Sequence, residues 1–149
     1  MINVTRYSVR LVKEDCKRYE LSKTINNVSK AAELFNQVFE MENLTNEIFV
    51  VLALDAKKNV IGTFKVSEGT IDATVVSTRD IFQRALLVNA HSIIIAHNHP
   101  SGNTEPSRQD IDFTKSVREA GDLMQIKLND SLIIGENGKY YSFLEHGVI

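Results

Sequence analysis

The apolar residues in the first third of the chain predict a helix followed by a buried hairpin. The residues of the helical face are Ala31, Leu34, Phe35, Val38 and Phe39. Their spacing of three and four residues is that of an amphipathic helix. Ile48–Leu54 is an unbroken apolar run, which is typical of a strand buried on both faces. A polar turn follows, and residues 60–66 are predicted to be the hairpin partner of that strand.

The middle of the chain predicts a second helix and a central strand. Ser77 stands where the helix would begin, and serine is a residue that caps a first turn. The apolar residues predicted to face inward from this helix are Ile81, Phe82, Ala85 and Leu86. Residues 91–97 contain three isoleucines in a row. Such an apolar segment is typical of a strand in the middle of a sheet.

The last third of the chain predicts a loop, a helix and a hairpin. Residues 100–106 are rich in Gly, Asn, Thr and Ser, which favours a loop. Ser107 is predicted to begin a third helix that ends near Gly121, a natural C-terminal cap. The residues on either side of Asn137-Gly138 are predicted to form two paired strands, because this dipeptide suits a tight hairpin turn.

Together these elements predict an α/β protein in layers. Residues 5–13 mix β-branched and aromatic side chains, so they are predicted to form a first strand. Residues 1–46 would then contribute a strand and a helix, and residues 47–149 the core of the fold. A chain of 149 residues suits one domain, so we expect a single domain over residues 1–149. Helices alternate with strands around a mixed sheet, which defines the α/β class.

Composition and charge narrow the classes of function. The formal net charge of −2 creates no overall attraction to a nucleic acid backbone. Cys16 is the only cysteine, which excludes intrachain disulfides, thiolate-rich zinc sites and cysteine-ligated deaminase sites; we expect it to be buried or half-buried. The start of the chain lacks the apolar core of a secretory signal, and the longest apolar run is far too short to span a membrane. We therefore expect a cytoplasmic protein without a membrane partner.

Two histidines at the end of the predicted central strand are candidates for binding a metal. His97 and His99 are two residues apart, so in an extended backbone their imidazoles leave the same face. The loop after them can return Asp110 as a third ligand, and two imidazoles with one carboxylate match a catalytic zinc site with an open fourth position. Paired imidazoles suit Mg²⁺ poorly. The alternative is that the two histidines form only a polar end of the strand.

Two further residues have both structural and functional interpretations. Ser107 and Asp110 have the spacing of a helix start, in which the serine side chain caps the first turn and the carboxylate accepts the backbone N–H of that serine. Ser77 and Asp80 have the same spacing before another helix, without histidines nearby, so the spacing alone does not make Asp110 a ligand. Glu47 precedes the first buried strand, where it is either a solvated side chain or a carboxylate within reach of a metal-bound water.

These residues resemble a known motif. His97-x-His99, seven intervening residues, Ser107-x-x-Asp110 and an upstream Glu47 resemble the JAMM motif of the JAB/MPN metalloproteases. The longer string HNHPSG, followed by PS and an aspartate, is similar to the bacterial RadC-like branch of that family. Gly69-Thr70 and the ending from Tyr141 to Gly147 add to this similarity, which covers two thirds of the chain or more.

The resemblance implies a site and an activity. His97, His99 and Asp110 would bind Zn²⁺, Glu47 would be the general base, and Ser107 would hydrogen-bond the oxyanion or the metal-bound water. The implied reaction is hydrolysis of a peptide or isopeptide amide bond by a metal-activated water, so the substrate would be a peptide or protein. The implied fold is the three-layer α/β/α mixed sheet of the JAB/MPN domain, which is cytidine-deaminase-like.

The sequence departs from the RadC-like pattern in two places. Full-length RadC proteins usually carry a helix-hairpin-helix region, whereas here 46 residues precede Glu47, so DNA binding through that region is not implied. The family also tends to have Asp-His where this chain has Asp130-Ser131. The alternative function is a non-catalytic or DNA-associated RadC-like module. Substrate selectivity would lie in loops such as residues 71–76 and 102–105, and exposed edge strands leave a homodimer open.

Overall fold

In a computed structural model that describes residues 1–69 and 76–149, the strands form one mixed sheet with the order β2-β1-β3-β4-β5. The strands are β1 (Ile48–Leu54), β2 (Val60–Glu68), β3 (Ser92–Asn98), β4 (Lys127–Ile134) and β5 (Tyr140–Ser142). The β3–β4 pair is parallel, and the other neighbouring pairs are antiparallel. The predicted β1–β2 hairpin, the central strand β3 and the hairpin around Asn137-Gly138 are therefore confirmed.

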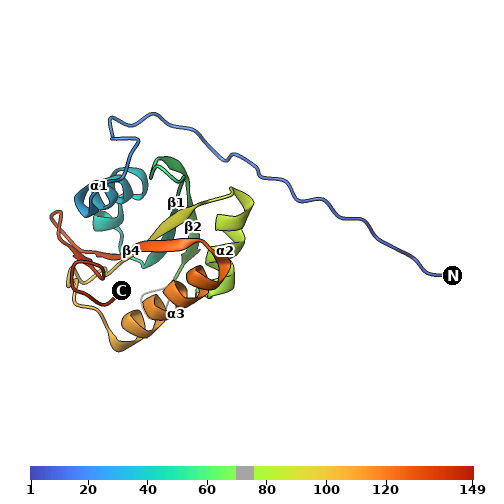
Figure 1. Ribbon diagram of the computed structural model, residues 1–149. Helices are drawn as coiled ribbons and strands as arrows, with labels where there is room; N and C mark the ends of the chain where they lie inside the picture. Colours follow the sequence, from blue (N-terminus) through green and yellow to red (C-terminus); the bar gives the residue numbers. More distant parts are fainter. Residues whose placement is uncertain (70–75) are drawn as a thin grey trace.

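Helices cover both faces of the sheet, which confirms the three-layer α/β/α architecture (Figure 1). The helices are α1 (Val28–Phe39), a short 3-10 turn η1 (Met41–Asn43), α2 (Thr78–Leu87) and α3 (Arg108–Met124). One apolar cluster joins α1 to the sheet, and a second cluster joins α2 and α3 to the opposite face. No helix in the described parts of the chain combines the length and apolar character needed to cross a membrane.

Strands β1 and β3 are buried along their whole length because both of their faces are covered. Val50 and Leu52 of β1 belong to the cluster under α1, whereas Val51 and Ala53 belong to the cluster under α2 and α3. Alternating side chains thus point to two cores. This is why both segments are continuous apolar runs rather than alternating ones.

The predicted strand over residues 5–13 is wrong. Residues 1–19 have no regular secondary structure and extend away from the rest of the molecule (Figure 1). Tyr7 is 86% exposed, and Cys16 is exposed rather than buried. A strand needs a partner for its backbone groups. The backbone pairing next to the start of β2 involves residues 23–25, with the bridge Thr24↔Asn59 and the bond from Val60 N–H to Lys23, and not residues 5–13. The β-branched and aromatic residues of this segment favour a strand, but the segment has no strand to pair with.

Two details of the predicted helices also differ. Leu86 is 48% exposed and so does not face inward from α2. Helix α3 continues past Gly121 to Met124, and Gln125 in the left-handed region is its C-cap. A Cβ atom on Gly121 would lie 2.5 Å from the carbonyl oxygen of Ile126. Gly121 therefore permits a close approach of two backbone segments, and it does not end the helix.

We predict that Gly121→Ala lowers the free energy of unfolding by about 1–3 kcal/mol, because the added methyl overpacks this contact. Gly62→Ala is the matched control, since nothing lies within 4 Å of the position of its Cβ. That variant should be unchanged or gain up to about 1 kcal/mol from a less flexible unfolded chain. Chemical denaturation measures both values. Equal effects of the two substitutions would contradict the close approach at Gly121.

Candidate metal centre

The pairing of β1 with β3 sets the frame of the site. Phe49 lies opposite His97 in the antiparallel register, and their rings stack with centroids 6.1 Å apart at an angle of 5°. Glu47 stands one residue before β1 and His99 one residue after β3, and the charge of Glu47 acts on His99. Since side chains two residues apart share a face, the two histidines and Glu47 emerge on the side of the sheet covered by α2 and α3.

A tight turn after His99 brings the start of α3 back to the strand end. The N–H of His99 donates to Ile134 at the end of β4, and the N–H of Gly102 donates to His99. At the start of α3 the Ser107 hydroxyl accepts the N–H of Asp110 at 3.1 Å, and the Asp110 carboxylate accepts the N–H of Ser107 at 2.8 Å. The predicted capping box is confirmed. It places the Asp110 carboxylate in the first turn of the helix.

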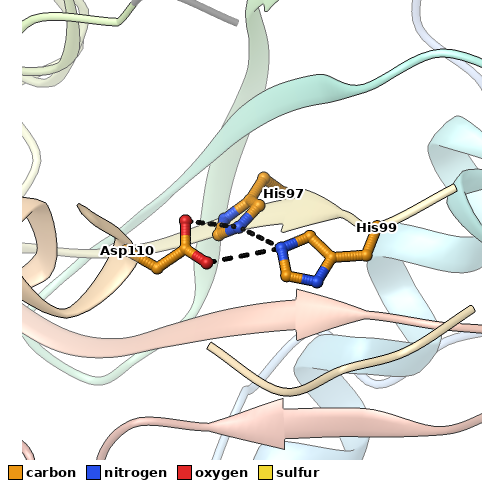
Figure 2. A group of neighbouring side chains, drawn as sticks. All are labelled: His97, His99 and Asp110. Carbon is orange, nitrogen blue, oxygen red and sulfur yellow. Dashed lines mark hydrogen bonds and ion pairs between the residues drawn. The ribbon is translucent and has the colours of Figure 1, made fainter. Parts of the chain in front are cut away.

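The side chains of His97, His99 and Asp110 converge on one point (Figure 2). The two Nε2 atoms lie 3.2 Å apart. Asp110 Oδ1 lies 3.2 Å from His97 Nε2, and Asp110 Oδ2 lies 3.4 Å from His99 Nε2. One ligand atom from each residue lies within 4.8 Å of the others. The three residues thus form a group that can hold a metal ion.

A backbone carbonyl fixes the orientation of one imidazole. His99 Nδ1 lies 2.7 Å from the carbonyl oxygen of Asn103. A carbonyl accepts only, so Nδ1 carries the proton and Nε2 of the neutral ring keeps its lone pair for a ligand. The sequence did not point to Asn103, because its contribution is a backbone atom that any residue type supplies. Asn103 lies in the 102–105 loop, whereas residues 71–75 of the other proposed selectivity loop are outside the described residues.

The electrostatics of the group favour a charged carboxylate among nitrogen donors. Burial opposes ionisation of Asp110, but hydrogen bonds from His97 and His99 outweigh it and hold the pKa of that carboxyl well below its usual range. The hydrogen bond to Asp110 raises the pKa of His99, and the negative charge of Glu47 adds to this shift. A site that attracts positive charge in this way also attracts a cation.

Glu47 and Ser107 lie at the edge of the group. Glu47 is half-buried; its carbonyl accepts the N–H of Gly69 at 2.9 Å, and its charge acts on His99. Ser107 is exposed at the start of α3. The predicted site residues therefore lie together at one end of the sheet. The two histidines and Asp110 form the centre of this group.

The fold and this group define a layered α/β protein with a candidate metal centre at the end of its central strand. A sequence profile of the RadC-like JAB domain matches residues 25–148. The chain belongs to this family. The family match includes every residue of the candidate site.

Most of this chain is similar in sequence to UPF0758 proteins of several bacteria. A UPF0758 protein of Geotalea uraniireducens is 38% identical over 133 residues, which are 89% of this chain and 57% of the relative. A UPF0758 protein of Clostridium beijerinckii is 40% identical over 137 residues, 89% of this chain and 59% of the relative. One from Thermotoga maritima is 36% identical over 128 residues, 86% of this chain and 57% of the relative. This chain thus spans less than two thirds of the length of these relatives.

The two capping boxes provide a matched test of Asp110 as a ligand. Asp80 occupies the same position at the start of α2, where it also completes a capping box. We predict that Asp110→Ala and Asp80→Ala both lower stability, because each removes a helix-start carboxylate, and that Asp110→Ala costs more, because it also removes the contacts to the two histidines. Only Asp110→Ala should abolish binding of one equivalent of Zn²⁺ or Co²⁺ in calorimetric titrations. Unchanged metal binding by that variant would remove Asp110 from the site.

Proposed function

We propose that the protein is a zinc-dependent hydrolase that cleaves a peptide or isopeptide amide bond. The observation that carries the proposal is the convergence of His97, His99 and Asp110 within 4.8 Å. Two imidazoles and one carboxylate leave the fourth position of a tetrahedral zinc ion open to a reactant, as in catalytic zinc sites. Membership of the RadC-like JAB domain family supports the same class of site.

The spacing of the donor atoms fits zinc. Ligands about 2.0–2.1 Å from a tetrahedral ion lie about 3.3–3.4 Å from one another. The two Nε2 atoms lie 3.2 Å apart, and each of them has its own Asp110 oxygen at a similar distance, 3.2 Å for His97 with Oδ1 and 3.4 Å for His99 with Oδ2. Imidazole donors favour zinc over the oxygen-seeking Mg²⁺. The Asn103 carbonyl behind His99 supplies the kind of outer partner that orients a metal-binding histidine.

A zinc ion held by these residues would supply a Lewis acid that lowers the pKa of a water molecule towards neutrality and polarises a substrate carbonyl. Glu47 would accept the proton that the attacking water loses, and would deliver it to the nitrogen of the amide bond as that bond breaks. The products are then a carboxylic acid and an amine. The electrostatic effect of Glu47 on His99 supports this role, since a general base must lie close enough to reach the attacking water.

Ser107 would stabilise the negative charge that develops on the substrate carbonyl oxygen. Its hydroxyl accepts the N–H of Asp110, and its own proton can be donated to a substrate atom. Ser107 also stands at the start of α3, where the positive end of the helix dipole favours negative charge. Capping the helix and binding the oxyanion are compatible roles for one hydroxyl group.

The proposed function extends to the substrate, the cellular location and the oligomeric state. The substrate would be a peptide or protein, the protein would act in the cytoplasm, and a homodimer would form through exposed edge strands. The DNA-associated module is the competing function. Zinc content separates the two: one tightly bound zinc ion favours the hydrolase, whereas a metal-free protein that shifts DNA in a gel favours the module.

We predict that Glu47→Gln still binds one zinc ion but lowers turnover by about 10²–10⁴-fold, the usual contribution of a positioned general base. Turnover is measured on a panel of peptides and isopeptide-linked substrates, and zinc by metal analysis. Glu33→Gln is the control, because Glu33 is an exposed carboxylate on α1, on the face of the sheet opposite to the site. That variant should keep wild-type turnover. Full activity of the Glu47 variant would show that another group is the base.

A further inference from the structure

We propose that Asn98, the residue between the two histidines, is a positioning residue that holds Glu47 beside the metal centre. This inference rests on the zinc hydrolase function proposed above, and it assigns a role to a side chain that touches neither metal nor substrate. The side chain of Asn98 is bonded to the backbone on both sides of Glu47, so the carboxylate is carried by a short segment fixed at both of its ends.

The contacts that carry the proposal are two hydrogen bonds. Asn98 Oδ1 accepts the N–H of Ile48 at 2.8 Å, and Asn98 Nδ2 donates to the carbonyl of Asn46 at 2.9 Å. Both partners lie about 50 residues earlier in the chain. Asn98 is only 1% exposed, so water competes little for these bonds. The amide group thus spans the backbone from Asn46 to Ile48.

Glu47 stands one residue before β1, which begins at Ile48. On the side of β2, the N–H of Gly69 donates to the Glu47 carbonyl. Asn98 supplies the corresponding restraint on the side of β3. With β2 and β3 on its two sides, the Glu47 segment continues the sheet beyond the end of the strand. Its side chain is then directed to the face that carries His97 and His99.

The residue type suits this task. The side-chain amide of asparagine offers one acceptor and two donors in a plane, which matches an N–H and a C=O on the same stretch of backbone. An aspartate would offer no donor to Asn46, and an apolar residue would leave both backbone groups unsatisfied. The simpler role is satisfaction of those groups alone. The two roles differ in one measurable way, which is whether the effect of Asn98 on the site passes through Glu47.

A double-mutant cycle on zinc affinity separates these roles without a substrate. Glu47→Gln removes a negative charge near the site and should weaken zinc binding by roughly tenfold. If Asn98 acts by holding that charge in place, Asn98→Ala should weaken binding to a similar extent. The double variant should then bind zinc no more weakly than Glu47→Gln alone. Dissociation constants come from competition with a chromophoric chelator.

Asn129→Ala is the matched control, because Asn129 bonds to Ser92 at the opposite end of β3. It should leave zinc affinity unchanged. Multiplicative losses for Asn98→Ala and Glu47→Gln would show that Asn98 acts on the histidines directly, and the inference would fail. No loss of affinity for Asn98→Ala would overturn it as well. A wild-type protein that binds no zinc would instead overturn the proposed function.

Amide hydrogen exchange tests the contact itself, including the case in which Asn98→Ala does not fold. In the wild-type protein, with or without zinc, the N–H of Ile48 should exchange slowly because a buried side-chain oxygen accepts it. Fast exchange at Ile48, with slow exchange elsewhere in β1, would show that Asn98 does not hold this segment. Where Asn98→Ala does fold, exchange at Ile48 should speed up, and the Asn129→Ala control should not change it.

Discussion

The antiparallel register of β1 with β3 is the constraint on which the site depends. It sets Phe49 against His97, two residues from Glu47 in one chain segment and two residues from His99 in the other. A shift of one residue would turn Glu47 to the opposite face of the sheet. The register is held because both strands are buried on two faces, so any shift would exchange the residues of two packed cores. The packing of the sheet thus sets which face the Glu47 side chain takes, although Glu47 itself stands one residue before β1.

Helix capping supplies the third ligand candidate. Ser107 with Asp110 and Ser77 with Asp80 form capping boxes of the same kind, so the local motif alone gives a helix start and nothing more. The difference lies in what each helix start faces. The turn after His99 directs the first turn of α3 towards two imidazoles, and there the Asp110 carboxylate serves the helix and the cluster together. Asp110 is therefore both part of the helix cap and a candidate metal ligand.

Much of this could be predicted from the sequence, for a physical reason. Apolar periodicity indicates which faces are buried, so α1, the β1–β2 hairpin and the start of α3 were predictable. The strand over residues 5–13 was not excluded by its pattern, because pairing depends on a partner that the segment itself does not encode. The close approach at Gly121 was likewise hidden, since a glycine near a helix end is equally typical of a cap. Backbone atoms such as the Asn103 carbonyl leave no signature in the residue type.

The contacts of Ser131 show how β4 supports the helix that carries Asp110. Ser131 is buried and lies beside Ile95 in the parallel register of β3 with β4, and its hydroxyl accepts a hydrogen bond from Thr114 at 3.2 Å. Thr114 follows Asp110 by four residues, so both lie on the same face of α3. The hydrogen bond between the buried hydroxyls of Thr114 and Ser131 therefore holds α3 against β4, on the helix face that carries Asp110.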